Sequence, residues 1–114
     1  MLTMYHNPRC SKSRQTLALL QEHHIDPEVV LYLETPPDAA TLRALLRKLG
    51  LTARQLLRTG EDAYKQNNLK TPGLSEDDLI AAMVKYPKLI ERPIVVKGNR
   101  AVIGRPPENV LALL

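Results

Sequence analysis

The sequence predicts a single α/β domain built on a four-stranded mixed sheet. Two short apolar strands flank a helix near the N-terminus, and a β-branched hairpin follows a run of helices. Strands that are joined through a helix run parallel, whereas the two strands of a hairpin are antiparallel. Because 114 residues suit one hydrophobic core, we expect residues 1–114 to form one domain.

The first elements alternate between strand and helix. A short apolar opening predicts a strand, and Asn7 and Pro8 favour a turn in the loop after it. In the helix that follows, we expect Leu17 and Leu20, with the neighbouring Ala18, to form the buried stripe. A second strand rich in Val and Leu comes next. The predicted ranges of these elements are residues 1–5, 11–24 and 28–33.

The middle of the chain predicts several helices inserted between the second and third strands. Thr35 is suited to an N-cap and Pro36 to the first helical position. Gly50 is suited to end that helix. Thr52, in a capping-box pattern, and Ser75, followed by three acidic residues, are suited to begin later helices. The leucines that repeat at i, i+3, i+4 and i+7 in the first of these helices are Leu42, Leu45, Leu46 and Leu49.

The C-terminal part predicts a hairpin and a last helix. Residues 94–96 are β-branched, and residues 97–99 favour a tight turn into residues 101–103. We expect the last helix to cover residues 108–114. The four strands then form a mixed sheet with flanking helices, which is a thioredoxin-like arrangement with a helical insertion between strands 2 and 3.

Composition and charge limit the classes of function. The chain has 16 basic and 12 acidic residues, a net charge of +4, and no Trp or Phe to stack on bases, so we expect no nucleic-acid partner. No apolar run has membrane-spanning length and no signal-peptide pattern opens the chain, so we expect a cytoplasmic protein without a membrane partner. Three scattered histidines and one cysteine predict no metal site.

The only cysteine, Cys10, lies where the first strand meets its helix. A lone cysteine in a reducing compartment is either a buried apolar residue or a reactive thiol. Free N–H groups and positive partial charge at a helix start favour the thiolate, and the same groups can bind an oxyanion. Arg9, Lys12 and Arg14 add positive charge nearby. These polar surroundings favour a reactive thiol.

Two further residues near Cys10 have open roles. Ser13 stands where a second cysteine would complete a C-x-x-C pair, so any redox cycle needs an external thiol. The Ser13 hydroxyl either donates to the Cys10 sulfur or belongs to an ordinary helix start. His6 is either an imidazolium that lowers the thiol pKa or a strand-end histidine without a role.

Three arginines are candidate oxyanion ligands. Arg92 and Arg105 each precede a proline at the two ends of the predicted hairpin, and Arg58 follows the short third helix. An arginine fork matches a tetrahedral oxyanion better than a lysine does. Spacing alone also fits three surface charges, and only convergence on Cys10 would decide for a site.

Five ordered segments resemble the glutaredoxin-dependent arsenate reductase family, and a short subgroup of it in particular. The similarity runs in register from end to end, which is far more specific than a lone C-x-x-S motif. The segments are residues 5–14, 31–36, 56–58, 91–96 and 104–108.

This resemblance implies a fold, a reaction and roles for named residues. Members have a thioredoxin-like fold with a helical insertion. The cysteine matching Cys10 attacks arsenate and forms a thioarsenate adduct, glutathione attacks that adduct, and glutaredoxin removes the glutathione before arsenite leaves. No metal or bound cofactor is implied, because glutathione is a co-substrate. The implied oxyanion ligands are Arg58, Arg92 and Arg105, and the implied supports of the thiolate are His6 and Ser13. From its nearby positive charge, Arg14 is a further candidate support.

Two other functions fit parts of the sequence. A related branch of the fold binds RNA polymerase as a redox-controlled regulator, but its switch is a C-x-x-C pair that Ser13 interrupts here. A glutathione-dependent thiol transferase acting on protein mixed disulfides would also use Cys10. Three arginines suited to an oxyanion favour the reductase.

Overall fold

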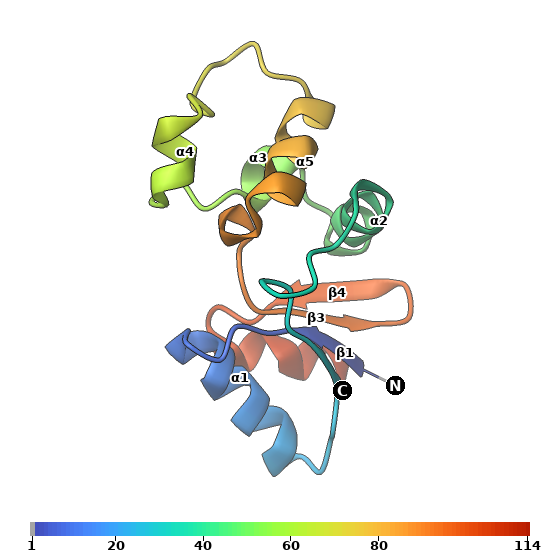
Figure 1. Cartoon of the computed structure of the whole chain (residues 1–114). Helices are drawn as coiled ribbons and strands as arrows, with labels where there is room; N and C mark the ends of the chain where they lie inside the picture. The colour runs from blue at the N-terminus through green and yellow to red at the C-terminus, as the bar shows by residue number, and fades with distance from the viewer. Residues whose placement is uncertain (1) are drawn as a thin grey trace. The chain divides into compact units, whose positions relative to one another are not determined.

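The structure, a computed structural model, describes residues 2–114. It contains two compact units, labelled along the chain in Figure 1. The sheet unit combines Met1–Thr35, of which Met1 lies outside the described residues, with Arg92–Leu114, and the helical unit is Pro36–Glu91. The expectation of one domain over residues 1–114 stays a prediction, and each unit is described by itself.

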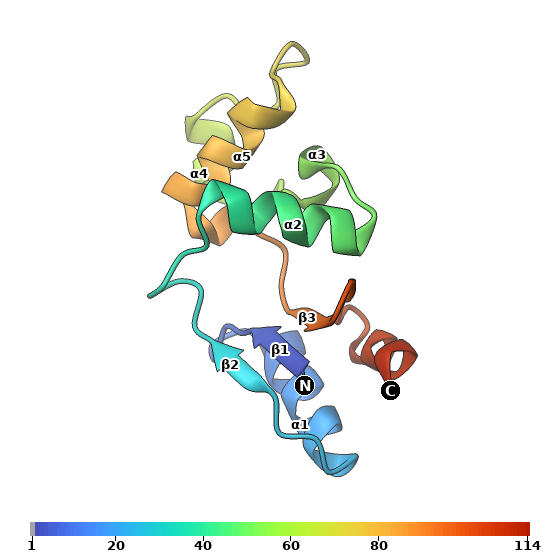
Figure 2. The same ribbon diagram turned by 90° about the vertical axis from the view of Figure 1, so that its right-hand side faces the viewer.

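The sheet unit contains the predicted four-stranded mixed sheet. Its strand order is β2-β1-β3-β4, with β1 parallel to β2 and antiparallel to β3, and with β3 antiparallel to β4. Figure 2 shows β2 beside β1. The elements of this unit are β1 (Leu2–Tyr5), α1 (Ser11–Glu22), β2 (Glu28–Val30), β3 (Ile94–Lys97), β4 (Arg100–Ile103) and the 3-10 helix η2 (Pro107–Leu113).

The core of the sheet unit lies between the sheet, α1 and η2. Leu2 and Met4 share one face of β1 because successive strand side chains alternate. Each fully buried aliphatic side chain there contributes about 1.5–3 kcal/mol. This packing fixes α1 against the strand that precedes it and therefore fixes where α1 begins. The buried cluster is formed by Leu2, Met4, Leu20, Val95, Val110 and Leu113.

Several predicted details of the sheet unit are wrong. In α1, Leu20 is buried and Leu17 packs partly buried against the core as predicted, whereas Ala18 is exposed. The other buried residues of α1 are polar, Ser13 and Thr16. Ser13 and Thr16 can be buried because their hydroxyl groups hydrogen-bond to segments outside α1. The spacing of apolar residues along the helix does not detect such bonds. The structure also ends α1 and β2 earlier than predicted, and it makes the last helix a 3-10 helix.

The helical unit confirms three predicted helix boundaries and corrects one. Gly50 ends α2 with φ 70°. Thr52 and Ser75 begin α3 and α5, each with a complete capping box. However, α2 begins after Asp38, whose carboxylate accepts a 2.8 Å hydrogen bond from the Thr41 N–H, so the predicted start at Thr35 is wrong. The elements are α2 (Ala39–Leu49), α3 (Ala53–Leu56), α4 (Asp62–Gln66), α5 (Glu76–Lys85) and the 3-10 helix η1 (Pro87–Leu89).

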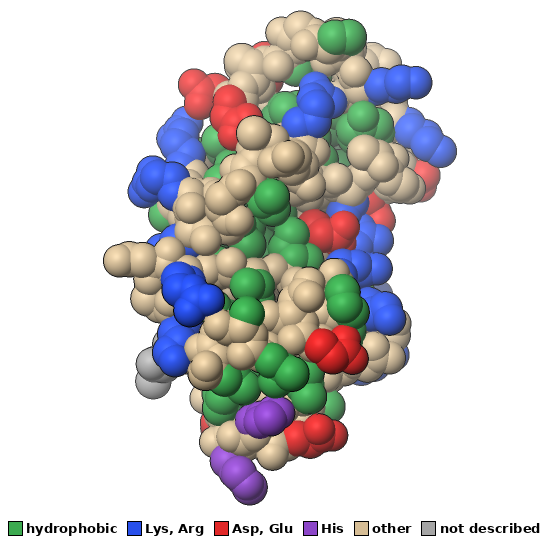
Figure 3. Space-filling view, turned by 180° about the vertical axis from the view of Figure 1, so that it is seen from behind, with side chains coloured by type: hydrophobic (Ala, Val, Ile, Leu, Met, Phe, Trp, Pro, Cys, Tyr) green, Lys and Arg blue, Asp and Glu red, His purple; other side chains and the backbone are tan. Residues whose placement is uncertain are grey.

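The surface carries mixed charge. On the face shown in Figure 3, Lys and Arg side chains lie among Asp and Glu side chains instead of forming one continuous basic stripe. Within residues 2–114, every helix falls short of the length and apolar character needed to cross a bilayer.

Candidate active site

Cys10 lies at the start of α1, as the sequence predicts. It is the N-cap residue, with φ −93° and ψ 124°. Its N–H donates to the Asn7 carbonyl at 3.0 Å, and its carbonyl accepts from the Arg14 N–H at 3.0 Å. The Asn7 side-chain oxygen accepts from the Arg9 N–H, also at 3.0 Å. These bonds fix the loop, so the thiol is held at the positive end of the helix.

A buried polar cluster lies under this loop. The His6 ring nitrogen Nδ1 is 2.6 Å from the Ser13 hydroxyl oxygen, which also accepts the Asn7 N–H at 3.0 Å. Burial, and then the charge of Arg14, lower the pKa of His6. The neutral imidazole is therefore favoured, in contrast to the imidazolium considered from the sequence. The Ser13 hydroxyl is thus engaged by His6 and by the Asn7 N–H, while a role of His6 and Ser13 in supporting the thiolate stays a prediction.

The two arginines at the ends of the hairpin lie beside Cys10. Arg105 Nη1 donates to the Cys10 sulfur at 3.7 Å and to the Arg92 carbonyl at 3.3 Å. The Arg92 guanidinium hydrogen-bonds to the same sulfur. Both Arg-Pro peptide bonds, Arg92-Pro93 and Arg105-Pro106, are cis. The structure thus brings together two of the three arginines proposed from the sequence with the cysteine.

These neighbours change the acidity of Cys10. Partial burial alone would raise its pKa, but the Ser13 N–H, the Arg92 guanidinium and the Lys12 N–H act in the opposite direction, and the net result is a lowered pKa. The two N–H contacts fall short of regular capping geometry, so they act mainly through their dipoles. A lowered pKa increases the thiolate fraction, and the thiolate is the nucleophilic form.

Arg14 supports the loop directly. Its Nη1 donates to the Pro8 carbonyl at 2.9 Å from the exposed side of α1. This bond spans the turn before Cys10, and the positive charge also disfavours protonation of His6. Arg14 therefore holds the backbone of the loop, while its support of the thiolate stays a prediction.

Arg58 belongs to the helical unit and has acidic partners there. Its Nη1 lies 2.6 Å from Glu91 Oε1 and its Nε 3.6 Å from Glu61 Oε2. An isolated antiparallel β-bridge between Leu57 and Ile90 brings the next residues, Arg58 and Glu91, close together. These contacts fix the guanidinium, while its role as an oxyanion ligand stays a prediction.

A groove borders the Cys10 loop within the sheet unit. It has a volume of about 290 Å³ and is lined by the His6–Arg9 stretch and by Leu31, Leu33 and Glu34.

A thiolate, two guanidinium groups and a helix start at one place can attack and hold a small tetrahedral oxyanion. Among residues 2–114, His, Cys, Asp and Glu side chains form no group of three that would hold a metal ion.

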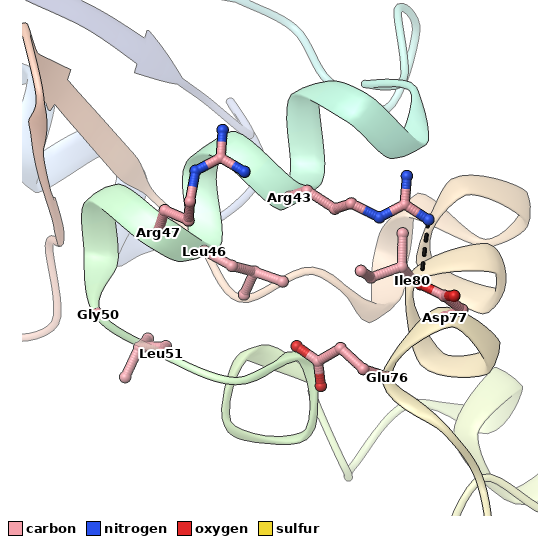
Figure 4. A pocket seen from close by; sticks show the side chains of 8 residues that line it. All are labelled: Arg43, Leu46, Arg47, Gly50, Leu51, Glu76, Asp77 and Ile80. Atoms are coloured by element: carbon pink, nitrogen blue, oxygen red, sulfur yellow. Dashed lines mark hydrogen bonds and ion pairs between the residues drawn. The ribbon is translucent and has the colours of Figure 1, made fainter.

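A second groove lies in the helical unit. Its volume is about 390 Å³, and α2 and α5 supply most of its walls, with Arg43 paired to Asp77 at 3.1 Å (Figure 4). None of the site residues predicted from the sequence lines it. We assign it no role in the chemistry of Cys10.

Sequence reasoning marked Asn7 only as a turn former, and it gave Thr16 and Gly104 no role of their own in the site. Asn7 holds the turn before Cys10 through its side chain and backbone. Thr16 and Gly104 connect α1 to the segment that carries Arg105. Thr16 and Gly104 meet across 88 positions of the chain, so the pattern of neighbouring residues gives no signal for this contact.

Comparisons with known proteins identify the family of the chain. The ArsC family profile matches residues 5–113. The chain is 63% identical over 112 residues to Uncharacterized protein YfgD of Escherichia coli (strain K12), covering 97% of this chain and 94% of that protein. It is 48% identical over 114 residues to an arsenate reductase of Neisseria meningitidis serogroup A, covering 99% and 97%.

A solved structure is similar over nearly the whole chain. The arsenate reductase from Vibrio cholerae matches with a TM-score of 0.97 at 53% identity, covering 99% of this chain and 97% of that one. This similarity confirms the predicted thioredoxin-like fold, and the profile match confirms the resemblance inferred from the five segments. The chain is a member of the ArsC family.

Proposed function

We propose that the protein is a cytoplasmic arsenate reductase that uses glutathione and glutaredoxin as external thiols. The observation that carries this proposal is the position of Cys10 at the start of α1 with Arg92 and Arg105 beside its sulfur. A nucleophile and an oxyanion site then coincide. A relative named arsenate reductase that is 48% identical over 114 residues supports the choice of oxyanion.

In the proposed first step, the Cys10 thiolate attacks the arsenic atom of arsenate. One arsenate oxygen leaves as water after protonation, and a thioarsenate adduct remains on the sulfur. Arg92 and Arg105 offset the negative charge on the remaining oxygens, and the N–H groups at the helix start add further donors. Arg58 is proposed as a third ligand on the strength of the family resemblance.

External thiols supply the two electrons of the reduction. Glutathione attacks the adduct at arsenic and displaces a second oxygen as water. A glutaredoxin thiolate then attacks the glutathione sulfur, so the arsenic–sulfur bond to glutathione breaks and its electron pair stays on arsenic. Glutaredoxin leaves as a mixed disulfide with glutathione, and water releases arsenite and returns the Cys10 thiol. This scheme fits a chain with one cysteine.

Arsenate-dependent NADPH oxidation tests the proposal. The assay contains glutathione, glutaredoxin and glutathione reductase, and it compares wild type with Cys10→Ser, which is nearly isosteric. We expect turnover in wild type and none in Cys10→Ser. A folded wild type without arsenate turnover would contradict the proposal. Reduction of a glutathionylated peptide by the same preparation would then favour the thiol transferase.

A further inference from the structure

A tight contact joins α1 to the end of the hairpin inside the sheet unit. Thr16 is fully buried, and its hydroxyl oxygen lies 2.8 Å from the Lys12 carbonyl and 3.3 Å from the Gly104 carbonyl. The Gly104 N–H donates to the Pro93 carbonyl at 2.9 Å. One hydroxyl therefore spans α1 and a loop that is 88 positions further along the chain.

Gly104 leaves no room for a side chain at this contact. A Cβ atom on Gly104 would lie 2.6 Å from the Thr16 Oγ1 and 2.9 Å from the Pro93 Cγ. Both distances are shorter than ordinary van der Waals contact, so an added methyl group must push the three segments apart. The φ of Gly104 is not in the left-handed region, and its requirement for glycine is therefore one of space.

The three segments that meet here each carry a group of the candidate site. Thr16 follows Cys10 on the same helix, Gly104 directly precedes Arg105, and Pro93 directly follows Arg92. A displacement at the contact must therefore change the distances between the sulfur and the two guanidinium groups. A hydrogen bond to the Lys12 carbonyl alone would satisfy the Thr16 hydroxyl. Its additional contact with the Gly104 carbonyl therefore links α1 to a distant segment of the chain.

We propose that Thr16 and Gly104 are positioning residues that set the distance between the Cys10 sulfur and the guanidinium groups of Arg92 and Arg105. Through this distance they determine the thiolate fraction of Cys10 and the fit of an oxyanion. The second consequence rests on the proposed arsenate reductase function. The first does not, because it concerns the thiol itself.

The test measures the Cys10 pKa and arsenate turnover in four variants. Cys10 is the only cysteine, so the ultraviolet absorbance of the thiolate across a pH series reports one group. Gly104→Ala inserts the methyl group, Thr16→Val removes the hydroxyl at nearly constant volume, and Thr16→Ser restores it. The matched control is Gly73→Ala, because a Cβ on Gly73 meets nothing within 4 Å.

We expect Gly104→Ala to raise the Cys10 pKa by about one unit, because the sulfur moves away from a positive charge. A displacement near 1 Å is also expected to lower kcat/KM for arsenate on the order of 10²-fold. Thr16→Val should likewise raise the Cys10 pKa and lower kcat/KM for arsenate. Thr16→Ser and Gly73→Ala should match wild type.

The contrary result is a lower melting temperature in Gly104→Ala and Thr16→Val with an unchanged Cys10 pKa, which would make the contact purely structural. If Gly104→Ala does not fold, the difference between Thr16→Val and Thr16→Ser decides. If wild type shows no arsenate turnover, the proposed function fails, and the thiol titration still decides whether Thr16 and Gly104 position the arginines.

Discussion

Arg105 Nη1 lies 3.7 Å from the Cys10 sulfur, although 95 positions separate the two residues. The same nitrogen donates to the Arg92 carbonyl at 3.3 Å. One guanidinium therefore connects the start of α1 with the segments directly before β3 and directly after β4. Arg105 is exposed and its contact with sulfur is long, so solvent screens its charge, whereas Arg92 both hydrogen-bonds to Cys10 and lowers its pKa.

Replacing Arg92 with alanine should raise the Cys10 pKa. The substitution removes the hydrogen bond and the charge that favour the thiolate, while the partial burial that opposes ionisation remains. The rate of Cys10 alkylation by iodoacetamide, measured across a pH series, tests this expectation. The midpoint of the curve of rate against pH should move to higher pH. Arg100→Ala is the matched control, because Arg100 bonds to the Ala112 carbonyl. An unmoved midpoint in Arg92→Ala would contradict this assignment.

Replacing Arg105 with alanine should affect turnover more than acidity. If Arg105 binds the oxyanion as proposed, its loss lowers kcat/KM for arsenate by about 10²- to 10³-fold, as for an oxyanion-hole donor. The Cys10 pKa should change little, because the screened charge of Arg105 contributes little to it. Arg105→Lys should recover only part of the rate, since lysine lacks the planar fork. Equal rates in wild type and Arg105→Ala would remove Arg105 from the site.

The position of the cysteine could be predicted from the sequence, but its supports could not. Short patterns identify Cys10 at a strand–helix junction and Thr52 as a capping box, because these features depend on neighbours in the chain. The burial of Ser13 and Thr16 depends on partners outside α1, so apolar periodicity identified Leu17 and Leu20 on the core side of α1 but missed this polar pair. Local patterns cannot report such long-range contacts.

His6 should make the fold sensitive to mild acid. Its folded pKa is lowered by burial and by Arg14, so the unfolded chain binds a proton first as the pH falls below about 6.5. The stability that depends on neutral His6 is complete above that pH and is lost as the pH falls toward the folded pKa. Urea unfolding between about pH 7 and pH 5 should show a steeper loss in wild type than in His6→Gln. Parallel curves would mean that His6 does not control acid stability.

Replacing Arg58 with lysine separates the effect of its positive charge from the effect of its planar guanidinium group. Its guanidinium is held by Glu91 at 2.6 Å and by Glu61 at 3.6 Å. The Arg58 and Glu91 side chains are 22% and 27% exposed. A pair in this setting contributes about 1 kcal/mol or less to stability. Arg58→Lys should therefore leave the melting temperature nearly unchanged.

Activity should respond differently if Arg58 is an oxyanion ligand as proposed. Arg58→Lys keeps the charge but loses the fork, and we expect kcat/KM for arsenate to fall by roughly 10²-fold. Glu91→Gln keeps a hydrogen-bond acceptor beside Arg58 and should retain more activity than Arg58→Lys, because the guanidinium itself remains. The matched control is Arg43→Lys, since Arg43 pairs with the exposed Asp77 in the same unit (Figure 4). If Arg58→Lys keeps the wild-type kcat/KM, the oxyanion ligands are restricted to Arg92 and Arg105. The Arg58–Glu91 pair would then only connect the segments around Leu57 and Ile90.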